Sequence, residues 1–216
     1  MARGRLITLE GGEGAGKSTQ ARLLAEHLSE AGVEVVLTRE PGGSALAEKI
    51  RDLILDPATP AHSQLAEALL FGAARADHLD GLIRPALDRG RWVICDRFSD
   101  STRVYQGTVG GLSADILGQL DAIIVGATQP DLTILIDIDP IVGLARVANR
   151  RASSQPADRY EGRTTDYHQQ LRDGFLAIAR REPVRCVVVD GFRSVDDLAR
   201  EIRGHVDARL LRMRGG

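Results

Sequence analysis

The chain has few of the residues that would place it among secreted or membrane proteins. It holds two cysteines in 216 residues, and no apolar run approaches the length needed to span a bilayer. Cys95 and Cys186 lie in apolar runs without the spacing of metal ligands, which predicts buried, reduced thiols. The first residues do not read as a signal peptide, so we expect a cytoplasmic protein without a membrane partner.

The chain also lacks an excess of positive charge. Its 28 lysines and arginines face 30 acidic residues, giving a formal net charge of −2, which is unlike a nucleic-acid-binding protein. Lysine itself is scarce, since Lys17 and Lys49 are the only lysines among the basic residues. From its length we expect residues 1–216 to form one domain, with a small lid inserted in it.

A glycine-rich segment at residues 11–18 carries the strongest motif that is present. It reads Gly-Gly-Glu-Gly-Ala-Gly-Lys-Ser, between the apolar run Leu6–Leu9 and a helical pattern, which is G-x-x-x-x-G-K-S in a strand–loop–helix context. Glycines let bare backbone N–H groups approach a phosphate, and the helix N-terminus adds a positive end. Lys17 can reach the β- and γ-phosphates and Ser18 can ligate Mg²⁺. The segment therefore predicts binding of a nucleoside triphosphate.

Short apolar runs alternate with helical patterns along the chain. Their lack of polar alternation predicts strands that are covered on both faces, in a five-stranded parallel sheet between two layers of helices. This is a three-layer α/β/α fold. Acids follow or end three of the runs, at the carboxyl edge where such sheets bind ligands: Glu10, Asp96 and Asp137. The predicted strands are Arg5–Leu9, Val33–Thr38, Trp92–Cys95, Leu132–Asp137 and Cys186–Asp190.

A segment at residues 149–165 loses the apolar periodicity and is surrounded by arginines. One interpretation is a solvated basic loop. Beside a phosphate-binding loop we favour an arginine-rich lid, because the charge of a phosphoryl group in transfer must be stabilised, an effect worth ~10³–10⁵ in rate. The arginines are Arg146, Arg150, Arg151, Arg159 and Arg163.

Two further arginines are candidates for an acceptor site. Arg39 follows the second predicted strand and Arg97 follows the third, so both should project from the ligand edge of the sheet. Two guanidinium groups there can hold the phosphate of an incoming monophosphate. Structural ion pairs with Glu40 or Asp96 are the alternative for each arginine.

A helical pattern from Gln64 to Leu79 offers a possible nucleobase reader. Phe71 and Arg75 are four residues apart and share a face, so a ring could stack on a base while a guanidinium meets a base carbonyl. A core position is the alternative for Phe71. A second predicted helix could supply the polar edge and far wall of the slot with Ser101, Thr102, Tyr105 and Gln106.

Taken together, these motifs resemble the bacterial thymidylate kinase family. The matching segments are GGEGAGKST at 11–19, TREPGG at 38–43, F-x-A-x-R-x-x-H at 71–78, DRFSDSTRVYQG at 96–107, PDLTILID at 130–137 and Asp158-Arg159-Tyr160-Glu161 in the lid. Their joint order and spacing are specific. The resemblance implies a P-loop NTPase fold, ATP-dependent phosphorylation of dTMP to dTDP with Mg²⁺, and a cytosolic homodimer.

The resemblance also implies roles at the acceptor site. Arg39 and Arg97 would hold the acceptor phosphate, Phe71 would stack on thymine, and Arg75 with Thr102 would address the edge of the base. Tyr105 would crowd the sugar 2′ position, and Glu13 would meet the 3′-hydroxyl. Ser101 and Gln106 would line the slot.

On the donor side, the resemblance places ATP on the glycine loop, with Arg146 and Arg193 near the adenine. Ser18 and Asp96 would stand near the metal. Because Gly14 occupies a position where some family members have arginine, the catalytic arginine is expected in the lid. The implied catalytic residues are Lys17, Arg97, Glu13, Arg150 and Arg151, with Arg159 as a second choice. The implied loop contacts are Gly11, Gly12, Glu13, Gly14, Ala15, Gly16, Lys17, Ser18 and Thr19.

Two other functions are possible from the sequence. A kinase of the same fold could use another nucleoside monophosphate or a small hydroxylated metabolite as acceptor. A GTPase-like switch is the second alternative, but a guanine-reading N-K-x-D motif is absent, because the single asparagine, Asn149, is followed by Arg150.

Overall fold

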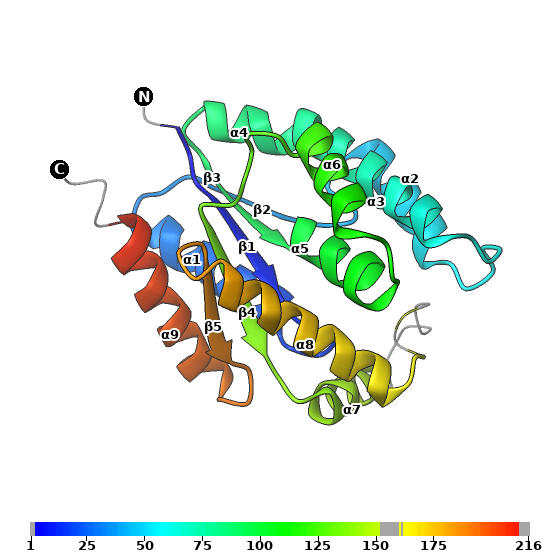
Figure 1. Cartoon of the computed structure of the whole chain (residues 1–216). Coiled ribbons are helices and arrows are strands. Elements are labelled where there is room, and N and C mark those ends of the chain that lie inside the picture. Colours follow the sequence, from blue (N-terminus) through cyan, green and yellow to red (C-terminus); the bar gives the residue numbers. More distant parts are fainter. Residues whose placement is uncertain (1–2, 152–159, 161, 212–216) are drawn as a thin grey trace.

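Five strands form one parallel sheet in the order β2–β3–β1–β4–β5 (Figure 1). The computed structural model describes residues 3–151, 160 and 162–211. The predicted strands are confirmed, with their ends shifted by one or two residues for the first three. Their bounds are β1 (Leu6–Glu10), β2 (Val35–Arg39), β3 (Trp92–Asp96), β4 (Leu132–Asp137) and β5 (Cys186–Asp190).

Helices cover both faces of the sheet, which confirms the three-layer α/β/α prediction. Helices α1 and α9 pack together on one face, while α4 and α8 contact strands from the other. The π-helical stretches η1 (Leu79–Ile83), η2 (Arg103–Val109) and η3 (Asp207–Leu211) extend three of the helices. The α-helices are α1 (Lys17–Glu30), α2 (Ala45–Leu55), α3 (Gln64–His78), α4 (Arg84–Asp88), α5 (Ser99–Thr102), α6 (Ala114–Ile124), α7 (Pro140–Arg151), α8 (Thr165–Arg181) and α9 (Val195–Val206).

The hydrophobic core follows the central strands. Leu9 and Ile134 pack with Leu24 of α1 and Ile202 of α9 in one buried cluster. All five residues of β1 are buried, because β3 and β4 flank it and helices cover both of its faces. The prediction that every strand is covered on both faces is wrong for the edge strands, where Leu37 of β2 is 47% exposed.

Parallel pairing brings the carboxyl ends of all five strands to one edge of the sheet. The backbone there is tied across strands, since Arg97 N donates to Leu9 O (2.9 Å) and Glu40 N donates to Asp96 O (2.9 Å). The loops after β1, β2 and β3 are therefore held side by side. Residues 152–159 and 161 of the predicted lid lie outside the described part of the chain. No helix in the described part is long and apolar enough to cross a membrane.

Candidate active site

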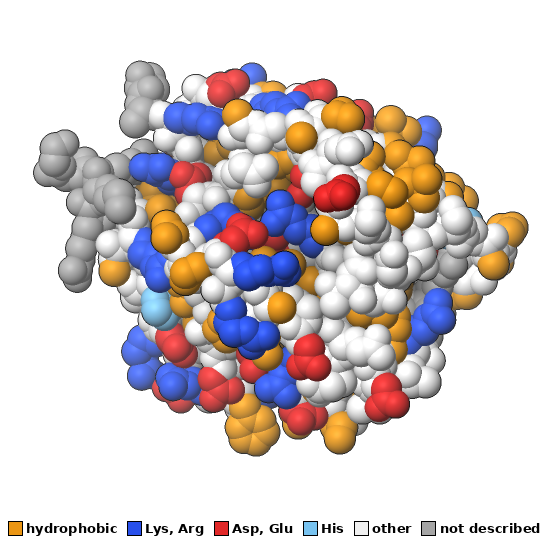
Figure 2. Space-filling model, viewed as in Figure 1, with side chains coloured by type: hydrophobic (Ala, Val, Ile, Leu, Met, Phe, Trp, Pro, Cys, Tyr) orange, Lys and Arg blue, Asp and Glu red, His pale blue; other side chains and the backbone are white. Residues whose placement is uncertain are grey.

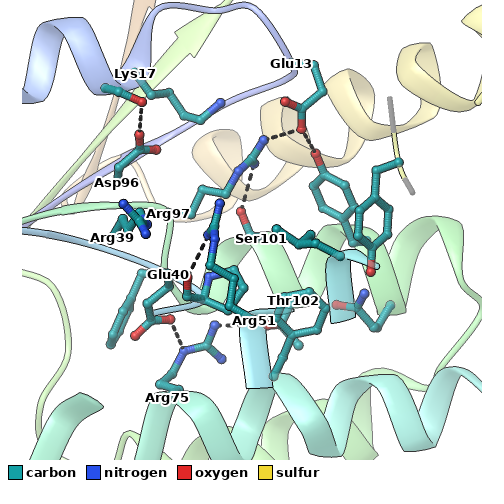
Figure 3. A pocket seen from close by; sticks show the side chains of 18 of the residues that line it. Glu13, Lys17, Arg39, Glu40, Arg51, Arg75, Asp96, Arg97, Ser101 and Thr102 are labelled. Carbon is teal, nitrogen blue, oxygen red and sulfur yellow. Dashed lines mark hydrogen bonds and ion pairs between the residues drawn. The ribbon is translucent and has the colours of Figure 1, made fainter. Parts of the chain in front are cut away.

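A cavity of about 430 Å³ lies at this edge of the sheet (Figure 3). The predicted site residues that line it are Glu13, Gly14, Gly16, Lys17, Ser18, Thr19, Arg39, Phe71, Arg75, Asp96, Arg97, Ser101, Thr102, Tyr105 and Gln106. Residues that the sequence did not indicate for the site also line it, namely Glu40, Pro41, Arg51, Leu55, Phe98 and Tyr160. The structure thus brings six residues of the predicted donor loop and the predicted acceptor residues into one cavity.

The glycine loop between β1 and α1 depends on backbone conformations that favour glycine. Gly11, Gly14 and Gly16 have φ values of 138°, 68° and 93°. A Cβ atom at Gly14 would lie 2.0 Å from the carbonyl oxygen of Gly143, so α7 approaches the loop too closely for a side chain. The loop ends at Lys17, where α1 begins and its N-terminus faces the cavity side of the loop. Gly11, Gly12 and Ala15 belong to the loop without lining the cavity.

Lys17 and Arg97 meet at one backbone oxygen. Lys17 Nζ donates to Gly11 O (3.2 Å) and Gly12 O (2.8 Å), and Arg97 Nη1 donates to Gly11 O (3.1 Å). The ammonium of the glycine loop and the guanidinium that follows β3 are therefore neighbours in a common pocket. Burial and the charge of Arg97 lower the pKa of Lys17 below its ordinary value.

Arg97 is held in an unusual backbone conformation. Its φ of 68° is the one positive value at a non-glycine residue in the described part of the chain. Its side chain donates to Glu13 Oε1 (2.6 Å) and to Ser101 Oγ (3.2 Å). Strain of this kind gathers at functional sites, where the surrounding contacts enforce it. Here it directs the guanidinium across the cavity to the glycine loop.

Glu13 joins the glycine loop to the acceptor side. Besides Arg97, it accepts a hydrogen bond from Tyr105 Oη (3.0 Å). Burial opposes ionisation of Glu13, but the charges of Arg97 and Lys17 outweigh it and lower the pKa to about 2. Glu13 is therefore an acceptor of hydrogen bonds at neutral pH.

The alternative ion pairs considered for the two arginines are not the ones found. Arg39 pairs with Glu48 of α2 (3.1 Å) rather than with Glu40, and Arg97 pairs with Glu13 rather than with Asp96. The Arg39 side chain is 55% exposed, so it reaches from the end of β2 to the rim of the cavity.

The proposed base slot lies between α3 and the segment formed by α5 and η2. Arg75 is buried, and it donates from Nε to Glu40 Oε2 (2.7 Å) and from Nη2 to Thr102 Oγ1 (3.1 Å). Phe71, on the same face of α3, is half-buried and lines the cavity. Sequence reasoning missed Glu40 as a site residue. The signal that could have found it is that a buried arginine, here Arg75, needs an acid as its partner. Gln106 also lines the cavity, and its amide nitrogen donates to buried Glu67 (3.2 Å).

Comparisons with known proteins agree with this geometry. The thymidylate kinase family model matches residues 9–202. The thymidylate kinase of Rhodopseudomonas palustris is 51% identical over 210 residues, covering 97% of this chain and 91% of that protein. That of Nitrobacter winogradskyi is 48% identical over 209 residues, covering 97% and 90%. The chain belongs to the thymidylate kinase family.

A solved structure supports the same assignment. The crystal structure of thymidylate kinase from Ehrlichia chaffeensis superposes with a TM-score of 0.77 at 35% sequence identity, covering 94% of this chain and 99% of that one. As a member of the thymidylate kinase family, the chain is a phosphotransferase. The glycine loop, Arg97 and the lining of the cavity therefore form its candidate active site.

The three acids at the carboxyl edge have different partners in this thymidylate kinase family member. Asp96 faces the cavity and accepts a hydrogen bond from Ser18 Oγ (2.5 Å). Asp137 forms a bidentate ion pair with Arg172 of α8 (2.7 and 2.9 Å). Glu10 is buried and accepts from Phe98 N (2.8 Å) at the start of α5. Among these acids, Asp96 is therefore the candidate metal ligand, together with the Ser18 hydroxyl.

The remaining predicted residues lie away from the cavity or outside the description. Arg146 Nη1 donates to Gly191 O (3.0 Å), and Arg193 pairs with Glu201 (3.2 Å) on the surface. Arg150 and Arg151 end α7, and the structure does not describe their side chains; Arg159 lies outside the described residues.

Proposed function

We propose that this chain transfers the γ-phosphoryl group of ATP to the phosphate of dTMP, giving dTDP and ADP. The observation that carries the proposal is the meeting of Lys17 and Arg97 at Gly11 O, because it joins a nucleotide-phosphate loop to an acceptor arginine in one cavity. Membership of the thymidylate kinase family supports the identity of both substrates.

On the donor side, the glycine loop would bind the phosphates through its backbone N–H groups and Lys17 would contact the β- and γ-phosphates. Ser18 and Asp96 present oxygen atoms only 2.5 Å apart, the hard donor type that Mg²⁺ prefers, so these residues would hold the ion. When bound, Mg²⁺ neutralises charge on the phosphates. We also propose that Arg146 and Arg193 lie on the adenine side.

On the acceptor side, Arg97 and Arg39 would hold the phosphate of dTMP in line with the γ-phosphorus. Phe71 would stack on thymine, and the donor-only guanidinium of Arg75 would meet a base carbonyl. Glu13 and Tyr105, joined at 3.0 Å, would contact the sugar.

The reaction needs no general base, because a phosphate monoester dianion is already a nucleophile at neutral pH. Catalysis is then positioning and electrostatic stabilisation by Lys17, Arg97 and one arginine of segment 149–165. We propose Arg150 or Arg151 for the last role.

We further propose one domain, a homodimer and a cytoplasmic location. Exposed apolar side chains on α3 and α6 support the dimer, because large apolar patches mark interaction surfaces. They are Leu65 (43% exposed), Leu69 (50%), Ile116 (37%) and Ile123 (81%), and Figure 2 shows hydrophobic side chains gathered in this region.

The free thiols of Cys95 and Cys186 support the cytoplasmic location, because thiols stay reduced in a reducing compartment.

An assay of acceptor preference tests the proposal. Purified protein is given ATP or GTP with dTMP, dUMP, CMP, AMP, GMP or no acceptor, and formation of ADP or GDP is coupled to an indicator reaction. We expect the highest kcat/KM with dTMP and almost no ADP without an acceptor. A higher kcat/KM for another acceptor would favour the other-acceptor kinase, and acceptor-independent hydrolysis with a preference for GTP would favour the switch.

A further inference from the structure

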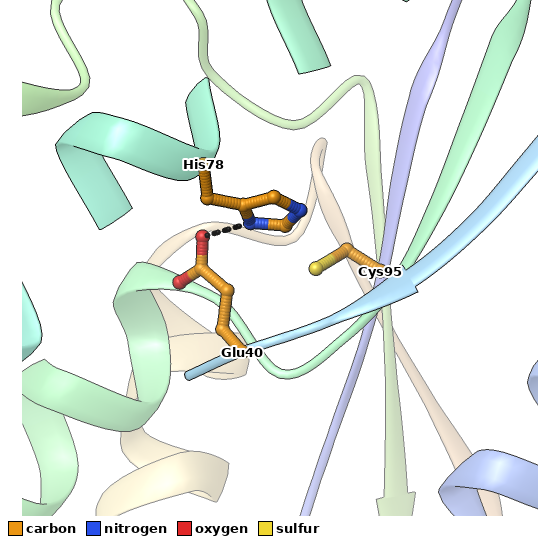
Figure 4. Close-up of side chains that lie close together, drawn as sticks. All are labelled: Glu40, His78 and Cys95. Carbon is orange, nitrogen blue, oxygen red and sulfur yellow. Dashed lines mark hydrogen bonds and ion pairs between the residues drawn. The ribbon is translucent and has the colours of Figure 1, made fainter. Parts of the chain in front are cut away.

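Behind the base end of the cavity lies a row of buried and partly buried polar side chains, and the proposed mechanism does not use Thr38, His78 or Glu40. Thr38 Oγ1 and His78 Nε2 lie 2.8 Å apart, and His78 Nδ1 lies 3.2 Å from Glu40 Oε1 (Figure 4). The other carboxylate oxygen of Glu40 accepts from Arg75 Nε (2.7 Å). The row joins β2 to α3 and ends on a residue that lines the cavity.

With a neutral imidazole at His78, one arrangement of protons satisfies every group in the row. Arginine can only donate, so Glu40 accepts from Arg75 and, at its second oxygen, from His78 Nδ1–H. A neutral imidazole with its proton on Nδ1 leaves Nε2 as an acceptor, and the Thr38 hydroxyl then donates to it. Glu40 therefore requires the proton on Nδ1, and the hydrogen bond from the Thr38 hydroxyl to Nε2 holds the ring in that orientation.

The packing around His78 leaves the ring little freedom. Its side chain is fully buried. A Cβ atom at Gly43 would lie 2.3 Å from His78 Nε2 and 2.5 Å from Thr38 Oγ1, so the glycine backbone closes that side of the row. The row is consequently a rigid support rather than a set of independent surface contacts.

These residues do not form a good metal site, although Cys95 completes a three-residue cluster with Glu40 and His78 whose ligand atoms lie within 4.8 Å of one another. Burial raises the pKa of the Cys95 thiol well above its ordinary value, and the thiol donates to Arg97 O (3.0 Å). The charge of Glu40 is matched by Arg75. The donor atoms are thus committed to hydrogen bonds within the protein.

We propose that Thr38 and His78 are positioning residues that set the selectivity for the acceptor base by fixing Arg75 through Glu40. The proposal rests on dTMP being the acceptor. Two of the three guanidinium nitrogens of Arg75 are held, by Glu40 and Thr102, which fixes the plane and direction of its donors. A fixed donor can form a hydrogen bond with a base carbonyl. An exocyclic amine of another base is itself a donor, so the Arg75 donor opposite it would stay unpaired, and sites of this kind reject such a base strongly.

Loss of the row would let Arg75 shift or rotate away from a mismatched base. The discrimination against a base with an exocyclic amine would then fall more than the rate with dTMP, because the residues that bind the acceptor phosphate stay in place. This separates positioning from a general loss of stability, which would lower activity with both bases together.

The test compares dTMP with dCMP, which carries an amine in place of the thymine 4-carbonyl. We expect His78→Leu to lower the ratio of the two kcat/KM values about tenfold or more. His78→Asn, whose amide can still donate to Glu40, should retain most of the ratio. Thr38→Val, which removes the hydroxyl at nearly constant volume, should lower it, whereas Thr38→Ser should not. Dissociation constants for dTMP and dCMP give the same comparison without turnover.

The outcomes separate the two proposals. An unchanged ratio in both His78→Leu and Thr38→Val, with wild type active on dTMP, would overturn the positioning role and leave the proposed function standing. Wild type that neither binds nor phosphorylates dTMP would overturn the proposed function and this inference with it. If His78→Leu fails to fold, as judged by thermal unfolding, the Thr38 pair decides the question.

Discussion

Replacing Glu10 by glutamine should reduce the dependence of folding stability on pH. Glu10 ends β1, is 1% exposed, and accepts from Phe98 N (2.8 Å), Ser101 N (3.2 Å) and Ser101 Oγ (2.6 Å). Burial, followed by the negative charge of Asp100, raises its pKa from 4.5 to about 7. Glutamine has nearly the same shape and does not titrate, so the substitution isolates the effect of the ionisable group.

The sign of the effect follows from proton binding. Because the pKa of Glu10 is higher in the folded protein than in the unfolded chain, the folded state holds more protons between pH 4.5 and about 7. The free energy of unfolding therefore falls as the pH rises through this interval. At ~1.4 kcal/mol for each pH unit, the span from 4.5 to about 7 corresponds to ~3 kcal/mol.

The measurement is urea-induced unfolding of wild type and Glu10→Gln at several pH values across this interval and at one protein concentration, since association also shifts stability. We expect the stability of wild type relative to the variant to fall by ~3 kcal/mol from the acid end to the neutral end. Glu30→Gln, at an exposed position of α1, is the control for a change in net charge. A difference between wild type and Glu10→Gln that stays constant with pH would refute the reasoning.

Three further predictions concern the loop and the lid. Lys17→Ala should lower kcat by ~10²–10³-fold, and near-normal turnover would rule out its role at the transferring phosphoryl group. Joint substitution of Arg150 and Arg151 by alanine should lower kcat by ~10³-fold with little change in KM for ATP; a change confined to KM would make them binding residues. Gly14→Ala, at φ 68° and with a carbonyl oxygen 2.0 Å from the new Cβ, should lower Tm by ~5 °C. Gly12→Ala, with no atom within 4 Å, should not, and equal Tm values for the two would contradict this.

The glycine loop, which is the proposed donor site, could be predicted from the sequence because its residues are contiguous. The strand, the glycines and Lys17 follow one another, so local backbone conformation already determines the loop, and the positive φ values of Gly11, Gly14 and Gly16 agree. The strands were also predictable, because buried parallel strands are continuous apolar runs. Their order was not, and only the order shows that β2 and β5 are at the edges.

The partners of the acceptor arginines could not be predicted, because they depend on distant segments. Neighbours in an extended chain point to opposite sides, so Arg39 and Glu40 diverge at the end of β2. Arg39 reaches Glu48 nine residues later, and Glu40 meets Arg75 of α3. The sequence pattern places charges at a sheet edge, but it does not show which of them pair.

The position of β2 has a consequence for how this fold can change. The glycine loop follows β1, which is paired on both sides and wholly buried, whereas Arg39 ends β2, an edge strand that pairs with β3 in the described sheet and is partly exposed. Substitutions in an edge strand generally disturb less structure than those in a central strand of a sheet. Evolution, or an engineer, can therefore alter the proposed acceptor end of this enzyme while the proposed triphosphate loop stays intact.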